Sequence, residues 1–112
     1  MKRWDVYWAD VPYEDDPAQS KRRPVVIAKD NTLYVLTLRV TSKGPRENDQ
    51  YDVVLTQWQF ANLAQPSVVR VRKIAQIGPE RVFERIGRLH PADIMEIQNR
   101  MDKLQAERSK RR

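Results

Sequence analysis

Hydrophobic and polar positions follow an alternating rhythm over most of this chain and a helical rhythm at its end. Near the start, Trp4, Val6 and Trp8 alternate with more polar residues, which predicts a half-buried strand with these three side chains on one face. The unbroken apolar run that follows Pro24 predicts a short, more fully buried strand over residues 24–29.

Alternation returns after the turn at residues 30–31. Four residues point to the expected core side of the next strand: Tyr34, Leu36, Leu38 and Val40. Because side chains alternate between the two faces of a strand, Arg39 and Thr41 are expected together on the opposite face.

Several further elements are expected downstream. Strands are predicted over residues 51–55, 67–77 and 83–89, a helical turn over 57–64, and a mobile polar loop over 42–50. In the strand that begins at Ser67, Arg70 and Arg72 share a face and lie roughly 7 Å apart.

A helix is predicted from His90-Pro91 onward, since proline suits a first helical turn. Its apolar stripe consists of Ile94, Ile97, Met101 and Leu104. Many short strands and one terminal helix favour a mainly β protein, a small and strongly curved barrel. We expect one domain over residues 1–107 and a disordered basic tail over 108–112.

The composition excludes several kinds of site. The 112 residues include no cysteine, which excludes a disulfide scaffold, a thiolate zinc site and a cysteine nucleophile. No apolar run reaches the roughly 20 residues that span a bilayer, and the first residues lack the apolar centre of a signal peptide. We therefore expect a cytoplasmic protein without a membrane partner.

The net charge of +6 lies entirely in the second half of the chain. Up to Thr56 there are nine basic and nine acidic residues, and from Gln57 onward there are twelve basic and six acidic ones. Such a surplus indicates a polyanionic partner, most often a nucleic acid or an acidic protein.

Most catalytic chemistries are missing from the sequence. His90 is the only histidine and is expected to cap the helix or lie at the surface. There is no glycine-rich phosphate loop, and the acidic residues 14–16 are read as charge balance, so neither a metal nor a cofactor is expected. Arginine, threonine and serine remain, and they suffice for cleaving RNA, whose own 2′-hydroxyl is the nucleophile.

The basic corner Lys21-Arg22-Arg23-Pro24 is the strongest local candidate for such a site. Pro24 fixes its own φ and pushes Arg23 toward an extended conformation, so Arg23 should project from a rigid strand edge. A guanidinium held there suits a phosphate. The competing interpretation is a basic loop end that is merely solvated.

The order of several motifs resembles the MazF/PemK (Kid) family of toxins. These motifs are Asp5-Val6-Tyr7-Trp8-Ala9-Asp10-Val11-Pro12, Gln19, Arg22-Arg23-Pro24-Val25-Val26-Ile27, Val40-Thr41-Ser42, Ser67-Val68-Val69, Arg81 and Ile86-Gly87-Arg88-Leu89. Together with the closing helix they extend over nearly the whole chain.

This resemblance implies an SH3-like barrel with a terminal helix, usually a homodimer. It also implies a metal-independent, sequence-selective endoribonuclease that cuts single-stranded RNA, is silenced by a cognate acidic antitoxin, and meets DNA only through the antitoxin complex. Arg23 and Thr41 take the catalytic positions. The expected RNA contacts are Gln19, Lys21, Arg22, Arg39, Ser42, Arg70 and Arg72.

Three positions depart from the family pattern. Trp4 replaces a glycine at the chain entry, Ala18 replaces a loop glutamate, and Arg72 stands where an acid is frequent. The cleavage sequence therefore cannot be carried over. Two other hypotheses stay open: a non-catalytic topoisomerase inhibitor like the CcdB toxins, binding through Ile94 and Met101, and a decayed relative that binds nucleic acid without cutting it.

Overall fold

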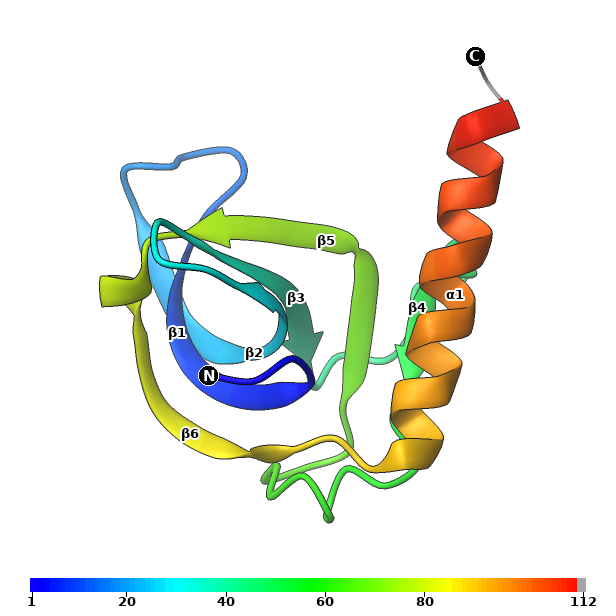
Figure 1. The fold of residues 1–112 in the computed structure, drawn as a ribbon. Helices are drawn as coiled ribbons and strands as arrows, with labels where there is room; N and C mark the ends of the chain where they lie inside the picture. The colour runs from blue at the N-terminus through cyan, green and yellow to red at the C-terminus, as the bar shows by residue number, and fades with distance from the viewer. Residues whose placement is uncertain (111–112) are drawn as a thin grey trace.

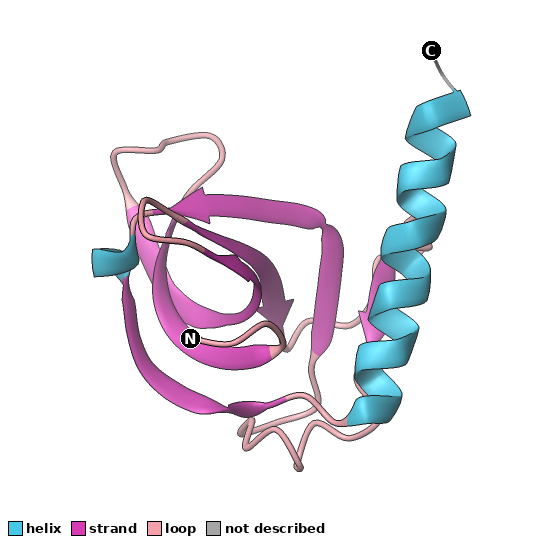
Figure 2. Ribbon diagram, in the orientation of Figure 1, coloured by secondary structure: helices cyan, strands magenta, loops and turns pink. Residues whose placement is uncertain are grey.

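The computed structural model describes residues 1–110, with positions 111 and 112 outside the described part. It is a mainly β fold with a C-terminal helix, as expected (Figures 1 and 2). In chain order the elements are β1 (Asp5–Pro12), β2 (Ser20–Asp30), β3 (Val35–Thr41), β4 (Asp52–Val54), β5 (Val68–Ile77), the short 3₁₀ helix η1 (Pro79–Arg81), β6 (Val82–Arg88) and α1 (Pro91–Lys110).

The six strands form one antiparallel sheet in the order β4-β5-β3-β2-β1-β6. The sheet is strongly curled, and β5 turns a sharp corner halfway along its length (Figure 1). Among the described residues, the edge strands β4 and β6 do not pair with each other, so the barrel-like sheet is open. The fold is the one that the resemblance implied.

Two apolar clusters lie on opposite faces of β2. Val26 belongs to the larger cluster, which α1 covers, while Val25 and Ile27 belong to the smaller one. A strand that is buried on both faces needs apolar residues at successive positions. This explains the unbroken apolar run and confirms the expectation of a fully buried strand.

The expected burial in β1 needs correction at one residue. Trp8 does not follow Trp4 and Val6 into the core; its relative exposure is 40%. The alternation of faces is intact, since Val6 packs in the larger cluster while Ala9 and Val11 pack in the smaller one. Trp8 therefore lies on the face of Val6 but is left exposed there.

The expected burial in β3 needs correction as well. Leu38 and Val40 are buried as expected, but Tyr34 and Leu36 are only half-buried. Val35, on the other face, is buried in the smaller cluster.

Helix α1 begins where the sequence predicted. The Nδ1 atom of His90 accepts a hydrogen bond from the Ala92 backbone N–H at 3.0 Å, so His90 caps the helix. Ile97 and Leu104 are buried, and Ile94 and Met101 pack against the same cluster. The stripe that the inhibitor hypothesis assigned to a partner is thus part of the core.

Further expectations concern residues 57–64, the C-terminal tail and Trp4. Residues 57–64 form turns and not a helical turn. The helix continues through Lys110, so three residues of the expected tail are helical and the last two lie outside the described residues. Trp4 adopts a φ of 76°, the left-handed conformation for which glycine is best suited. No helix within residues 1–110 combines the length and apolarity that crossing a membrane requires.

Candidate nucleic-acid interface

The basic corner of β2 lies at a free strand edge. Residues 20–24 pair with β1 only, and pairing with β3 starts at Val25, which faces Arg39. Proline has no N–H to donate and is best tolerated where no neighbouring strand needs it. Pro24 occupies such a position, which confirms that Arg23 projects from a strand edge.

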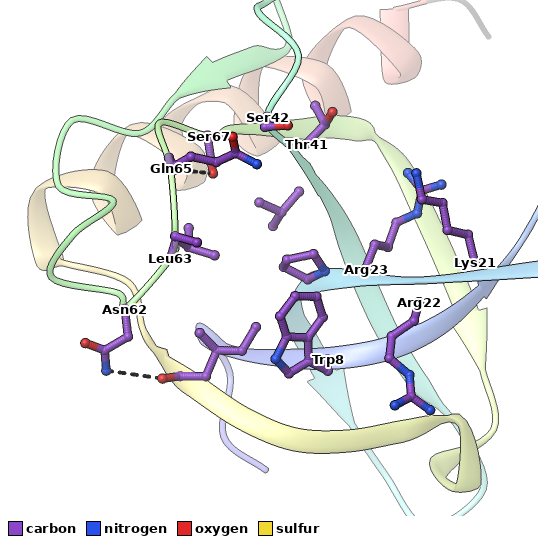
Figure 3. Close-up of a pocket in the computed structure, with 14 residues that line it drawn as sticks. Trp8, Lys21, Arg22, Arg23, Thr41, Ser42, Asn62, Leu63, Gln65 and Ser67 are labelled. Atoms are coloured by element: carbon purple, nitrogen blue, oxygen red, sulfur yellow. Dashed lines mark hydrogen bonds between the residues drawn. The ribbon is translucent and has the colours of Figure 1, made fainter.

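Neighbouring side chains on this corner lie on opposite sides of β2 and have different contacts. Arg22 lies 3.6 Å from the Asp10 carboxylate and stacks over the Phe83 ring at 4.0 Å. Arg23 lies on the opposite side of the strand and extends with Lys21 toward Thr41 (Figure 3). The alternation along β2 therefore separates a partnered arginine from Arg23.

The corner in β5 brings two further arginines together. Leu38 of β3 faces Ile74, but the next residue, Arg39, faces Arg70, so residues 71–73 have no partner on β3. Like charges that face each other directly across two strands are destabilising. A local conflict of this kind is typical of a functional site.

A cationic groove of about 320 Å³ runs over these strands. Nine residues line it, and seven of them are basic. The basic ones are Lys21, Arg23, Arg39, Lys43, Arg46, Arg70 and Lys73, and the other two are Thr41 and Ser42. We refer to this surface below as the cationic groove. Its composition is suited to the phosphates of a nucleic-acid backbone.

Two carboxylates offset part of this charge. Asp52, whose side chain is fully buried, bonds Arg46 at 2.8 Å and Arg70 at 3.1 Å. Glu14 bonds Lys73 at 2.8 Å and lies 3.9 Å from Arg39. The hydrogen bond from Lys73 outweighs the effect of burial and lowers the pKa of Glu14.

The Arg23 side chain has no hydrogen-bonded or ionic partner among residues 1–110. The Nε atoms of Arg23 and Arg39 are both buried without a hydrogen-bond partner. Burial lowers the pKa of the Arg23 guanidinium, and the nearby charge of Arg39 lowers it further. The Arg23 side chain is half-buried, and a partly desolvated cation without a partner is costly, so this arrangement favours binding of an anion.

Thr41 lies at the end of β3, on the face that the alternation predicted. Its Oγ1 atom accepts a hydrogen bond from the Lys43 backbone N–H at 3.2 Å. A hydroxyl that accepts such a bond keeps its own proton for donation. Thr41 can therefore donate a hydrogen bond to an oxygen of a bound phosphate.

A second, more apolar hollow adjoins the groove. This apolar pocket has a volume of about 330 Å³ and is lined by Trp8, Lys21, Arg22, Arg23, Pro24, Val40, Thr41, Ser42, Asn62, Leu63, Ala64, Gln65, Ser67 and Ile86 (Figure 3). Arg23, Thr41, Ser42 and Lys21 line both the pocket and the groove. The boundary between the two surfaces therefore runs through the expected catalytic pair.

The loop before β5 forms one wall of the apolar pocket and is held against β6. The Nδ2 atom of Asn62 donates to the Ile86 carbonyl at 3.2 Å, and Asn62 has a φ of 62°. At Gly87 a Cβ atom would lie 2.4 Å from the Ala61 carbonyl oxygen, so only glycine permits this close approach. The loop thereby presents two amide side chains, Asn62 and Gln65, to the pocket.

Most of the predicted site residues are brought together. The groove or the pocket is lined by Arg23, Thr41, Lys21, Arg22, Arg39, Ser42 and Arg70. Gln19 and Arg72 line neither; Arg72 instead lies 3.3 Å from Asp49 and stacks over the Tyr51 ring. The two surfaces are also lined by residues that the sequence did not indicate as site residues, among them Trp8, Lys43, Arg46, Asn62, Gln65 and Lys73.

Metal-ligating side chains do not gather at this site. Within residues 1–110, no group of three or more His, Cys, Asp or Glu side chains is placed to hold a metal ion. The chemistry that these surfaces offer consists of hydrogen bonding and charge stabilisation by arginine, lysine and threonine.

Known proteins resemble this chain in sequence and in fold. The family described as "PemK-like, MazF-like toxin of type II toxin-antitoxin system" matches residues 2–104. An endoribonuclease from a mycobacterial species, solved in complex with its cognate antitoxin, is similar with a TM-score of 0.70, 19% identity and 92% of both chains covered.

A second endoribonuclease from a mycobacterial species has a TM-score of 0.67 and 18% identity, over 92% of this chain and 88% of that one. Comparison with curated protein sequences finds no match.

Proposed function

Because this chain belongs to the PemK-like, MazF-like toxins of type II toxin–antitoxin systems, we propose that it is an endoribonuclease that cuts single-stranded mRNA and thereby inhibits growth. One observation carries the proposal: Arg23 lies unpaired where the cationic groove meets the apolar pocket, beside Thr41. The two similar endoribonucleases support it.

The proposed reaction uses the nucleophile of the RNA itself. The 2′-hydroxyl oxygen attacks the adjacent phosphorus while its proton passes to water, and the P–O5′ bond breaks. The products are a 2′,3′-cyclic phosphate and a 5′-hydroxyl. The protein contributes by aligning the attacking and leaving oxygens and by stabilising the charge that develops on phosphorus.

Arg23 and Thr41 have different roles in this reaction. The Arg23 guanidinium binds the phosphate oxygens through its fork of donors, and its lowered pKa makes it a better proton donor to the leaving O5′. The Thr41 hydroxyl donates to a non-bridging oxygen. Metal independence is part of the proposal, because this mechanism needs no Lewis acid.

Selection of the RNA sequence is assigned to the apolar pocket. Single-stranded RNA is read by unstacking bases onto aromatic side chains and by hydrogen-bonding their edges. Trp8 offers such an aromatic surface, and the amides of Asn62 and Gln65 offer both donors and acceptors.

The proposed partners follow from the charge of the groove and from the family. A cognate antitoxin should cover the cationic groove with an acidic segment, and DNA is met only through that complex. A homodimer is also proposed, supported by the exposed aromatic side chains of Phe60 and Phe83. A toxin that cuts mRNA acts in the cytoplasm.

The decisive experiment is incubation of the purified protein with a long RNA in EDTA, followed by mapping of the ends. We expect discrete cuts with 2′,3′-cyclic phosphate ends, lost in Arg23→Ala and strongly reduced in Thr41→Val. Arg85→Ala, which removes an arginine on β6 that lines neither surface, is the matched control. Absence of cuts, or cuts that require Mg²⁺, would refute the proposal.

A further inference from the structure

Behind the cationic groove lies a carboxylate that does not line it. The Asp52 side chain on β4 is fully buried, and it receives four hydrogen bonds from two arginines. Arg46 donates its backbone N–H at 2.9 Å, its Nε at 3.0 Å and its Nη2 at 2.8 Å. Arg70 donates its Nη1 at 3.1 Å.

Asp52 is ionised under working conditions. Burial alone would raise the pKa of Asp52, but the hydrogen bonds and charge of Arg46, with the charge of Arg70, outweigh burial and leave the pKa below its ordinary value. The ionised carboxylate therefore holds both guanidiniums at neutral pH.

The two arginines come from different segments that meet at the groove. Arg46 belongs to the loop that follows Thr41, and Arg70 belongs to β5. Across the sheet Asp52 faces Arg70, and Arg70 in turn faces Arg39. The Asp52 carboxylate thus holds Arg70 beside the like charge of Arg39, and through Arg46 it also holds the loop that follows Thr41.

We propose that Asp52 is a positioning residue for RNA cleavage: it holds Arg46 and Arg70 in the geometry in which they meet the RNA phosphates, without contacting the RNA itself. This inference rests on the proposed function. Without the carboxylate, the repulsion between Arg39 and Arg70 would drive the two guanidiniums apart.

Positioning and mere structural support predict different results. Replacing Asp52 by asparagine removes one negative charge, frees the guanidinium of Arg70, and leaves that of Arg46 held only by Asp49, which it bonds at 2.8 Å. RNA binding should then strengthen and depend more steeply on salt, because more cations are available to neutralise phosphates. Turnover should fall, because those cations no longer occupy fixed positions. A purely structural defect would instead lower turnover and binding together.

The test compares Asp52→Asn with Asp5→Asn, which changes the other buried carboxylate held by two arginines, neither of which lines the groove. For each variant we would measure thermal stability, kcat on a cleavable RNA, and the salt-dependent affinity for a 2′-O-methyl RNA that cannot be cut. For Asp52→Asn we expect kcat at least about tenfold lower, equal or tighter binding, and a salt slope steeper by roughly 0.7 for each added phosphate contact. Asp5→Asn should keep the wild-type kcat.

A double-mutant cycle sharpens the test. If Asp52 acts through Arg70, then Asp52→Asn should lower kcat much less in an Arg70→Gln background than in the wild type. Unchanged kcat in folded Asp52→Asn, additive effects in the cycle, or parallel loss of binding and kcat would each overturn the inference.

Should Asp52→Asn not fold, Asp52→Glu is the second variant, since it keeps the charge and moves the carboxylate by one methylene. It should lower kcat with an unchanged salt slope, and wild-type kcat would overturn the inference. A wild-type protein that cuts no RNA would refute the proposed function and this inference together. Cutting by the wild type with equal kcat in the variants would refute the inference alone.

Discussion

Two regions of this molecule gather arginines around a buried aspartate, and they differ in the charge left over. At the start of β1, Asp5 is bonded by Arg85 at 3.4 Å and by Arg88 at 3.2 Å. Behind the cationic groove Asp52 is bonded by two arginines as well, but the guanidinium of Arg23 beside them has no partner among the described residues. The number of arginines is therefore a poor guide to a binding site, and the unpaired ones are informative.

The two regions also differ in what they stabilise. The Asp5 cluster joins β1 to β6, since Asp5 faces Arg88 across that pair and Arg88 also bonds the Arg3 carbonyl at 2.9 Å. The groove instead combines directly opposed arginines with buried Nε atoms that lack acceptors. Both features lower stability in the free protein, as is typical of a site whose ligand completes it.

The largest expected contrast comes from replacing one arginine by lysine in each region. Arg23→Lys keeps the charge but loses the fork of donors that fits a phosphate, so we expect kcat to fall on the order of 100-fold. Arg85→Lys should leave kcat within about twofold of the wild type, because Arg85 lines neither surface. Single-turnover cleavage of one defined RNA measures both. Equal rates for the two variants would contradict the distinction between the regions.

The next largest effect concerns the free energy of unfolding, and here the change is made in the Asp5 region and not in the groove. Hydrogen bonds from Lys2, Arg85 and Arg88 outweigh burial and lower the pKa of Asp5. A group with a lowered folded-state pKa stabilises above its unfolded pKa and loses that effect as the pH falls through the folded value. Asp5→Asn should therefore cost about 1–3 kcal/mol at pH 7, and the difference from the wild type should shrink below roughly pH 4.

Urea unfolding of the wild type and Asp5→Asn at pH 7 and pH 3 measures this difference. RNA cleavage at pH 7 serves as the control and should be unchanged. A cost that stays constant between the two pH values would show that the ionised carboxylate is not its source.

The smallest expected effect concerns Glu14, in the loop between β1 and β2, which does not line the groove but pairs with cations that do. It bonds Lys73 and lies near Arg39, so a phosphate must compete with it. Glu14→Gln should raise the affinity for an uncleavable RNA about three- to tenfold at low salt, with the gain vanishing at high salt. Glu84→Gln, on exposed β6, is the matched control. Weaker binding in Glu14→Gln would mean that the glutamate contributes to RNA recognition.

The sequence predicted those parts of the molecule that depend on local pattern. Pro24 marked a free strand edge, alternation placed Arg39 and Thr41 on one face, and His90-Pro91 marked the start of α1. Each of these relies on backbone chemistry or side-chain period within a few residues.

Long-range register could not be predicted. Lys73 reaches the groove because β5 turns a corner against β3, and Trp8 stays exposed on the face of Val6 because no other element covers it fully. A one-residue shift moves a side chain to the other face, and periodicity along a single strand does not reveal such shifts. The positive φ of Asn62, which shapes the wall of the apolar pocket, depends likewise on its contact with Ile86 on β6.

The order of strands in the sheet has a consequence for the time at which activity can arise. The groove collects side chains from Lys21 to Lys73, and β1 completes its pairing only with β6, near the end of the chain. A ribosome adds roughly 5–20 residues per second, so several seconds of synthesis pass before the groove has all its cations. A nascent chain shorter than this carries Arg23 but lacks the strands that hold its surroundings. If the proposed function holds, the polypeptide cannot attack the message from which it is being translated until most of it has been made.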